Sequence, residues 1–224
     1  MKVIFSFTLL MAIRTFSQVF YKLELNWISE IKNDFSDVRL AMLLNHTSLY
    51  EPLFLQAAPV SFIWQLSKKM VAPGADKTLN RPIVGFFWKL MGPDFISISR
   101  KRDKTWFHFL KLIKQKSIVL IAPEGRMKRS NGLDSKGKPM SVRSGVAEII
   151  DVIDEGRIAI AYSGGLHHVQ HPGQHFPKLF QTIKLNIEVL EIHDYKALFN
   201  SDGIQFRKDI VADLETRVRT KVPA

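Results

Sequence analysis

Residues 40–52 read LAMLLNHTSLYEP, and this stretch decides the predicted fold. Its five apolar residues, Leu40–Leu44, have the length of a short buried strand, which ends at the polar pair Asn45 and His46. Comparable apolar runs follow at Phe62–Trp64, Phe95–Ile98, Ser117–Ile121 and Ile158–Tyr162. More helix-like segments separate these runs, and strands that alternate with helices indicate an α/β layered domain with a mostly parallel central sheet flanked by helices.

Three further segments complete the predicted organisation. Apolar residues recur at helical spacing from Asp103 to Gln115, which predicts a helix packed on the core. Apolar and polar residues alternate from Ile183 to Val189, the pattern of a strand covered on one face, and we expect this late strand near an edge of the sheet. Residues 126–143 read as a long loop.

The composition predicts one folded domain with an anionic partner. A chain of 224 residues with 46% hydrophobic and 24% charged residues is long enough to bury a real core and shows no sign of disorder. Its lack of cysteine excludes disulfides, thiolate metal sites and a cysteine nucleophile. A formal charge of +11 favours binding to an anionic membrane surface or to nucleic acid, and the charge alone does not choose between them.

The N-terminal segment favours the membrane. The run Val3–Ile13 is almost wholly apolar and lies between Lys2 and Arg14. At this length it is too short to span a bilayer and indicates an interfacial or core-packed helix. A cleaved signal peptide is the alternative, but no small-residue cleavage site follows Ile13. We therefore expect residues 1–30 to form a membrane-associating helical segment and residues 31–224 to form the main domain.

A histidine and a carboxylate follow the first strand. Strand ends of open α/β sheets are where sites collect, and His46 lies there, five residues before Glu51. Pro52 favours a helix start directly after Glu51, which leaves His46 in the preceding loop and lets the two side chains meet. Glutamate is an uncommon cap, so its carboxylate is available to orient His46 as a general base. Alternatively, Ser48 caps the helix, Glu51 closes a capping box, and His46 is a hydrogen-bonded loop residue.

Basic residues follow two other predicted strands. Residues 100–102 read Arg-Lys-Arg after the strand Phe95–Ile98, and residues 122–129 read APEGRMKR after the strand Ser117–Ile121. The fork of a guanidinium matches a phosphate, so two such clusters at neighbouring strand ends predict a phosphate pocket beside His46.

Taken together, these motifs resemble the glycerolipid acyltransferase superfamily, which includes the lysophosphatidic acid acyltransferases. The family carries Asn-His-x4-Asp, Phe-Ile-x-Arg and Pro-Glu-Gly-Thr-Arg in this order, and the likeness covers roughly residues 40–190. Residues 80–85, NRPIVG, also resemble the family's Pro-x-x-Gly element, and Gly92 precedes the second motif as in the family. Each motif alone is weak, whereas the ordered set is specific.

The resemblance implies an O-acyltransferase, residues 31–224 being its catalytic domain. His46 is then the general base, oriented by Glu51, that activates the hydroxyl of a lysophospholipid for attack on a fatty acyl thioester. The likeness implies no cofactor and no metal; the thioester of coenzyme A or of acyl carrier protein is a co-substrate. It also implies a location on the cytoplasmic face of a membrane. The residues implied to bind the acceptor are Arg100, Glu124, Gly125, Arg126 and Arg129.

The chain departs from the family pattern at three places. Glu51 stands where the family has aspartate, Met127 replaces the usual first arginine of the third motif, and Arg126 replaces its threonine. The strand Ile158–Tyr162 lacks the proline of the family's Val-Pro-Val element. These departures put the acceptor's identity and its phosphate contacts in question.

Three other functions remain as alternatives: a metal site, nucleic-acid binding and lipid binding without efficient catalysis. His167, His168, His171 and His175 lie close together, but Pro172 and Gly173 mark a loop and the spacing matches no metal motif. A basic nucleic-acid-binding module would use the charge with Trp106 and Phe107, yet no nucleic-acid motif is present, and we expect no nucleic-acid partner. A catalytically weak lipid-binding relative of the family is the third alternative, with Glu51 as its lesion.

Overall fold

The computed structural model describes residues 1–75, 90–91, 94–98, 103–113, 117–171, 174 and 176–224. Within these residues, one seven-stranded sheet has the order β1-β7-β6-β2-β5-β3-β4. The strands are β1 (Lys22–Trp27), β2 (Val38–Leu44), β3 (Met70–Ala75), β4 (Asp94–Ile98), β5 (Ile118–Ile121), β6 (Arg157–Ser163) and β7 (Thr182–Glu191). Only β6 and β7 pair antiparallel, so the sheet is mostly parallel, as the sequence predicts.

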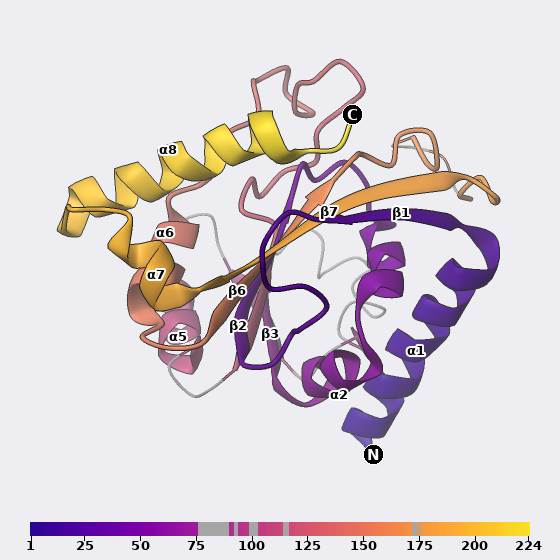
Figure 1. Ribbon diagram of the computed structural model, residues 1–224, viewed down its shortest axis with the longest axis horizontal. Coiled ribbons are helices and arrows are strands. Elements are labelled where there is room, and N and C mark those ends of the chain that lie inside the picture. The colour runs from indigo at the N-terminus through magenta and orange to yellow at the C-terminus, as the bar shows by residue number, and fades with distance from the viewer. Residues whose placement is uncertain (76–89, 92–93, 99–102, 114–116, 172–173, 175) are drawn as a thin grey trace.

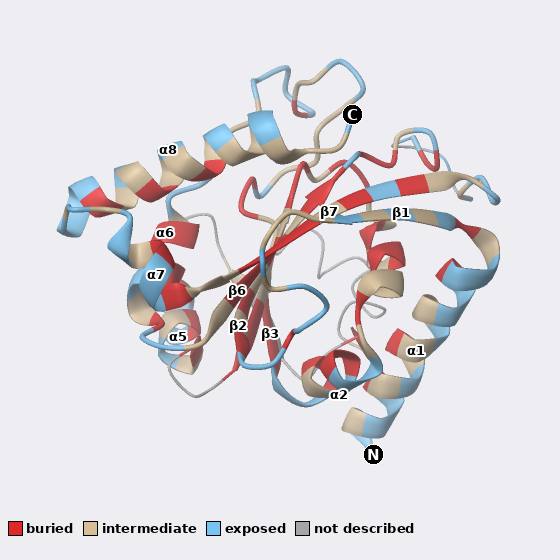
Figure 2. Ribbon diagram, in the orientation of Figure 1, coloured by how far each residue is buried: buried red, intermediate tan, exposed pale blue. Residues whose placement is uncertain are grey.

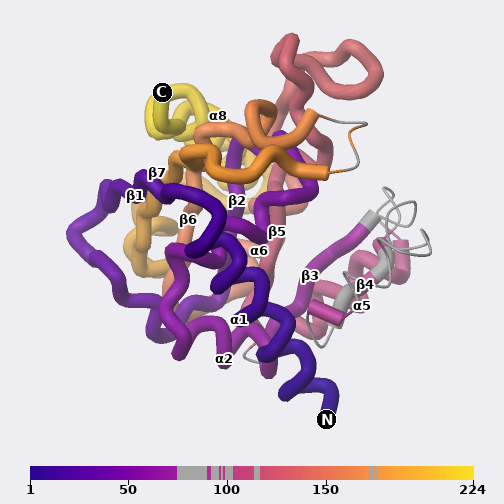
Figure 3. The backbone as a smooth tube through the Cα atoms, turned by 90° about the vertical axis from the view of Figure 1, so that its right-hand side faces the viewer, coloured from indigo at the N-terminus to yellow at the C-terminus, as the bar shows by residue number. Residues whose placement is uncertain are grey.

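Helices cover both faces of the sheet, which confirms the predicted layers (Figure 1). The helix α1 (Lys2–Phe20), the 3-10 helix η1 (Glu51–Ala57) and α2 (Val60–Lys69) lie on one face. The helices α5 (Lys104–Ile113), α6 (Gly145–Val152), α7 (Ile192–Ala197) and α8 (Gly203–Lys221) pack on the other. Residues 126–143 form no helix or strand and extend past the edge of the sheet, as expected for a long loop (Figures 1 and 3).

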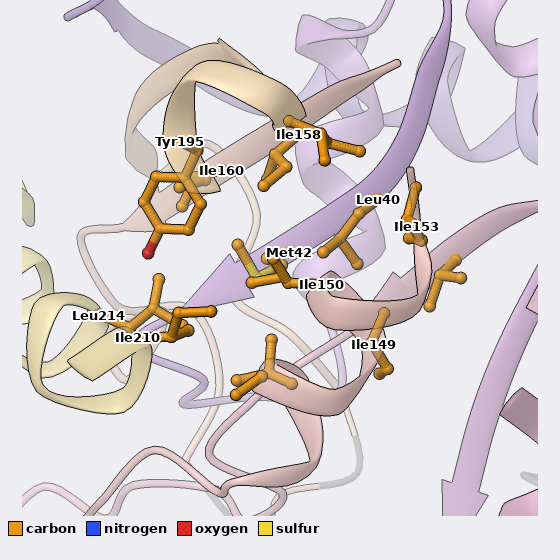
Figure 4. Packing of buried hydrophobic residues seen from close by; sticks show 14 of the residues in the cluster. Leu40, Met42, Ile149, Ile150, Ile153, Ile158, Ile160, Tyr195, Ile210 and Leu214 are labelled. Atoms are coloured by element: carbon orange, nitrogen blue, oxygen red, sulfur yellow. The ribbon is translucent and has the colours of Figure 1, made fainter. Parts of the chain in front are cut away.

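One of the two hydrophobic cores lies between the centre of the sheet and α6 and α8. Leu40 and Met42 of β2 and Ile158 and Ile160 of β6 are at most 1% exposed and meet these helices (Figure 4). Alternate residues of β2 point to the opposite face, toward α1, η1 and α2. The colouring by burial shows the sheet as the most buried layer (Figure 2).

The structure corrects one sequence prediction. Phe62–Trp64, predicted as a strand, belongs to α2, where Phe62, Ile63 and Leu66 are buried at helical spacing. A three-residue apolar run cannot distinguish a strand from a helix, because both bury it. The strand β7 lies second from the edge of the sheet, as expected, and β1 pairs in parallel along its outer side. The predicted helix at 103–115 is present as α5, and residues 114 and 115 lie outside the described residues.

The N-terminal helix is longer than its apolar core predicted. It continues past Ile13 to Phe20, and by length and composition α1 is the one helix in the described chain that could cross a membrane. It also packs on the domain, because Ser6, Leu10 and Ser17 are buried and Ser6 Oγ donates to the Met91 carbonyl (2.7 Å). Within the same N-terminal segment, residues 22–27 contribute the strand β1 to the sheet.

Candidate active site

The loop after β2 is turned sharply by Asn45. This residue has φ +62°, a left-handed conformation in which asparagine is among the favoured residue types. Its side-chain Nδ2 donates to the carbonyl of Ser163 (2.7 Å), the last residue of β6, and its side-chain Oδ1 accepts from Lys128 Nζ (3.2 Å). Asn45 thereby links the ends of two adjacent strands and directs the chain of His46 out of the sheet.

The side chains of His46 and Glu51 meet across this loop. Nδ1 of His46 contacts Oε2 of Glu51, and the other oxygen of Glu51 accepts the backbone N–H groups of Thr47 (2.7 Å) and Ser48 (3.3 Å). Glu51 is the first residue of η1, whose N-cap is Tyr50, so Glu51 is not itself the cap. The Oγ of Ser48 accepts from the N–H of Tyr50 and does not cap the helix. The contacts of Glu51 with the His46 ring and with the two backbone N–H groups hold its carboxylate in one orientation toward the imidazole.

Glu124 holds the backbone of the same loop. It follows β5, and its two oxygens accept the N–H groups of Asn45 (3.0 Å) and His46 (2.7 Å). Its side chain is buried, and it does not line the cavity beside His46. Gly125, which does line that cavity, has φ +62°, where a residue with a Cβ would be strained.

The charges around His46 favour its protonated form. Burial alone lowers the pKa of His46, but the charge and hydrogen bond of Glu51, with a smaller contribution from Glu124, outweigh burial and raise the pKa. Burial raises the pKa of the Glu124 carboxyl, although the two backbone N–H groups that it accepts act in the opposite direction. The site is therefore a histidine flanked by two carboxylates, one on its ring and one on its backbone.

The cations after Glu124 have different surroundings. Arg126 forms an ion pair with Asp134, so it is engaged within the loop 126–143. In the part of the chain that the structure describes, the guanidinium of Arg129 has no hydrogen bond or ion pair, and it lines the cavity that contains His46. Arg100 and the elements at 80–85 and 92 lie outside the described residues.

A cavity of about 1080 Å³ is lined by His46 and Glu51, by residues between the sheet and α1, η1 and α2, and by residues beside α5 and α6, among them Trp106 and Val146. Ala41, Ala159 and Ala161 form part of its floor, and their small side chains leave space that larger residues would fill. On the opposite side, Leu10 of α1 and Phe54 of η1 line it. The cavity is mainly apolar and has the histidine in its lining, so it can hold a hydrocarbon chain whose polar end reaches His46.

The cluster of histidines lies beside this site without forming a metal centre in the described residues. His167 Nε2 contacts the Lys128 carbonyl (2.8 Å), and its ring stacks with that of His171. No group of three or more His, Asp or Glu side chains there is placed to hold a metal ion. His175 lies outside the described residues.

The sequence did not predict the hydrogen bonds between the His46 loop and the residues that follow β6. The hydroxyl of Thr47 accepts the N–H of Leu166 (2.9 Å), and Ser48 Oγ donates to Gln170 Oε1 (3.1 Å). Both partners follow β6, more than a hundred residues along the chain. The contacts of Glu124 could have been found, because β5 and β2 are parallel neighbours and the residues that follow them lie at one edge of the sheet.

Comparison with known proteins identifies the family. A family model described as Acyltransferase matches residues 30–160, more than half of the chain. The chain belongs to the acyltransferase family. The region that the family model matches contains the motifs at 45–51 and 123–129.

The acyltransferase fold is also found in a solved structure. The crystal structure of the 1-acyl-sn-glycerophosphate (LPA) acyltransferase PlsC from Thermotoga maritima superposes with a TM-score of 0.54 at 15% sequence identity. The alignment covers 96% of this chain and 81% of that one. No curated protein sequence matches this chain. At this identity the structural likeness shows a shared fold.

Proposed function

We propose that this acyltransferase moves a fatty acyl group from an acyl thioester to the hydroxyl of a lysophospholipid similar to lysophosphatidic acid. The observation that carries the proposal is the His46–Glu51 pair in the lining of a mainly apolar cavity. Glu51 occupies Nδ1, which leaves Nε2 as the nitrogen available to the acceptor. A carboxylate in this position fixes the tautomer and stabilises the imidazolium that forms.

The reaction follows from this arrangement. His46 Nε2 takes the proton of the acceptor hydroxyl as the oxygen attacks the thioester carbonyl carbon. The tetrahedral intermediate then collapses, the C–S bond breaks, and the imidazolium returns the proton to the leaving thiolate. The products are the ester and the free thiol of coenzyme A or of acyl carrier protein, and the acyl chain lies in the cavity.

Arg129 is the proposed ligand of the acceptor's phosphate. Arg129 lines the cavity, and among the described residues its guanidinium has no protein partner. Arg126 of the same motif is instead paired with Asp134. Arg100, outside the described residues, is the second proposed ligand on the basis of the motif. Met127 removes one cation from the family pattern, so Arg129 carries more of the binding energy here than it would beside a second arginine.

The exposed apolar face of α1 is the proposed membrane contact. Ile4, Phe5 and Val19 are 64%, 54% and 63% exposed, while Leu10 on the opposite face lines the cavity. A lysophospholipid resides in the bilayer, so a helix that contacts the bilayer and the acyl cavity at once would bring the acceptor to His46. The proposed location is the cytoplasmic face of the membrane.

The test is transfer of a labelled acyl group from its thioester to a panel of lysolipids in anionic vesicles, with thioester hydrolysis counted separately. Wild type is compared with His46→Ala, Glu51→Gln and Glu51→Asp, and with His193→Ala, whose side chain is 87% exposed, as the matched control. Loss of the base should lower the rate by roughly 10²–10⁴-fold. Full activity of folded His46→Ala would refute the base assignment. Vesicle binding without transfer to any acceptor would instead identify a lipid-binding relative.

A second comparison tests the phosphate contact. Arg129→Met should raise KM for an acceptor that carries a phosphate monoester by roughly tenfold or more, since a charge-assisted pair is lost. For an uncharged acceptor such as monoacylglycerol, the same substitution should leave KM unchanged. Equal effects on both acceptors would show that Arg129 does not bind the phosphate.

A further inference from the structure

The loop that connects β6 to β7 carries an unusual set of exposed aromatic residues. Phe176 and Phe180 are 85% and 76% exposed, and Leu179 between them is 38% exposed. Phe180 has φ +58°, a conformation that bulky residues rarely adopt. A large apolar side chain kept in such a conformation and in contact with water indicates a surface that binds something.

The patch continues onto the C-terminal end of α1. The N–H of Phe180 donates to the carbonyl of Phe20 (2.8 Å), and their ring centroids are 5.7 Å apart. The ring of Phe20 in turn lies 4.8 Å from that of Phe16. Figure 3 shows the loop beside this end of α1. We call the aromatic patch the three residues that these contacts join, Phe16, Phe20 and Phe180, together with their neighbours in the sequence Val19, Phe176 and Leu179.

The charge around the aromatic patch fits an anionic bilayer. Lys178 lies exposed within the loop, and the Lys22 side chain next to Phe20 is 73% exposed and pairs with Glu24 (3.3 Å). Neither α1 nor the sequence from 164 to 181 contains an acidic residue. Aromatic side chains that enter the interface, with lysines at the headgroups, are the chemistry by which proteins lie on anionic membranes.

The loop also contacts the active site. Near its start, Leu166 and Gln170 bond the side chains of Thr47 and Ser48, the two residues after His46. Near its end, Phe180 is bonded to α1. The same loop therefore joins the aromatic patch to the residues that follow the histidine, so docking of the patch would set the active site at the lipid surface.

We propose that residues 176–180 form a second membrane-docking element, which inserts Phe176 and Phe180 into the interface of an anionic bilayer beside α1. This inference rests on the proposed membrane contact of α1 and adds a defined loop to it. Docking at two points fixes the rotation of the domain about α1, which one helix cannot do alone. The cavity and His46 then open toward the leaflet that holds the acceptor.

Vesicle binding of the full chain tests the inference. We would compare wild type, the double variant Phe176→Ser/Phe180→Ser and the control Phe107→Ser, whose residue on α5 is 62% exposed. Vesicles of phosphatidylcholine and phosphatidylglycerol are the probe. The double variant should lose about tenfold or more in partition coefficient, given the transfer free energy of two phenylalanine side chains, and the control should not change. Equal binding of the double variant and wild type would overturn the inference.

A second measurement leaves the patch intact. Because the chain has no cysteine, Lys178→Cys can carry a single fluorescent label, and Lys208→Cys on α8 is the matched control. Quenching by spin-labelled lipids should occur at position 178 and not at 208, whereas equal quenching would refute the docking geometry.

Acyl transfer to a water-soluble short-chain acceptor should be unchanged in Phe176→Ser/Phe180→Ser. If wild type itself transfers no acyl group to this soluble acceptor, the proposed chemistry is contradicted, whatever the result for docking. Loss of self-association in the double variant, without a change in vesicle binding, would assign the patch to a second copy of the chain.

Discussion

The carboxylate of Glu124 accepts the backbone N–H of His46 at 2.7 Å, so the loop of the proposed base is held from the end of the neighbouring strand. The other oxygen of Glu124 holds the preceding N–H, that of Asn45. Glu51 fixes the ring and Glu124 fixes the backbone. Preorganisation of this kind matters because a displacement of about 1 Å at a reacting group can lower a rate by roughly 100-fold.

Replacement of Glu124 by glutamine should therefore damage both stability and activity. The amide keeps one acceptor oxygen, but its NH2 group faces a backbone N–H, so one buried donor loses its partner. We expect a loss of about 1–3 kcal/mol in the free energy of unfolding and a fall in kcat that exceeds any change in KM. Denaturant unfolding and steady-state kinetics measure the two effects. Glu155→Gln, at an exposed position, is the control; identical behaviour of the two variants would refute the role of Glu124.

The fold and the His46–Glu51 contact could be predicted from the sequence because their signals are local. The apolar run Leu40–Leu44 and the turn that ends at Pro52 lie within one short segment. The support from Gln170 and Leu166 could not be predicted, because it depends on which strand lies beside β2. The position of Phe62–Trp64 in α2 was also ambiguous, since its short apolar run fits either kind of element.

The rate should depend on pH through His46. The acceptor's proton can be taken only by the neutral imidazole, so activity should rise with pH through the raised pKa of His46. Glu51→Gln removes the largest cause that raises the pKa, so the midpoint of this rise should move to lower pH while the maximal rate falls. A pH profile of kcat/KM measures both. An unchanged midpoint in Glu51→Gln would contradict the coupling.

The contribution of His46 to the free energy of unfolding should fall as pH rises, whereas the rate should increase. A histidine whose pKa is raised by folding stabilises the folded chain most below its unfolded pKa of about 6.5. That contribution is lost as pH rises through the higher pKa of the folded state. Urea midpoints across this range should therefore fall more steeply with pH in wild type than in His46→Ala. The exposed His193→Ala variant should follow wild type.

The loop 126–143 should loosen when Asp134 loses its charge. Its carboxylate pairs with Arg126 and accepts the N–H groups of Lys136 (2.8 Å) and Lys138 (2.9 Å). Hydrogen bonds from Lys138, Lys136 and Arg126 hold the pKa of Asp134 below its ordinary value. The stabilisation is therefore present above the unfolded pKa and lost as pH falls through the lower folded one.

Hydrogen exchange of Asp134→Asn checks this loop. The amides of Lys136 and Lys138 should exchange roughly tenfold faster or more at neutral pH, because each loses a charged acceptor. The released loop should also position Arg129 less well and raise KM for the phosphate-bearing acceptor. Asp209→Asn on α8 is the control, and protection retained in Asp134→Asn would show that the loop is held by other contacts.

The anchoring of α8 depends on a buried ion-pair network around Glu188 of β7. Its carboxylate accepts from Tyr162 (2.6 Å), Arg217 (2.7 Å) and Lys221 (2.6 Å), and the side chains of Glu188 and Arg217 are 7% and 11% exposed. Burial alone would raise the pKa of Glu188, but these donors lower it. Removal of Arg217 leaves a buried carboxylate with fewer partners, which is more damaging than the loss of both members of the pair.

Arg217→Met should accordingly lower the free energy of unfolding by about 3–5 kcal/mol, and Arg219→Met, at an exposed position of the same helix, by much less. The double variant Glu188→Gln/Arg217→Met should recover part of the loss, because the buried side chain that keeps only Lys221 as a cationic partner after Arg217→Met then carries no charge. Denaturant unfolding of wild type, Glu188→Gln, Arg217→Met and the double variant completes a double-mutant cycle. Purely additive losses would show that the two side chains contribute to the stability of α8 independently of each other.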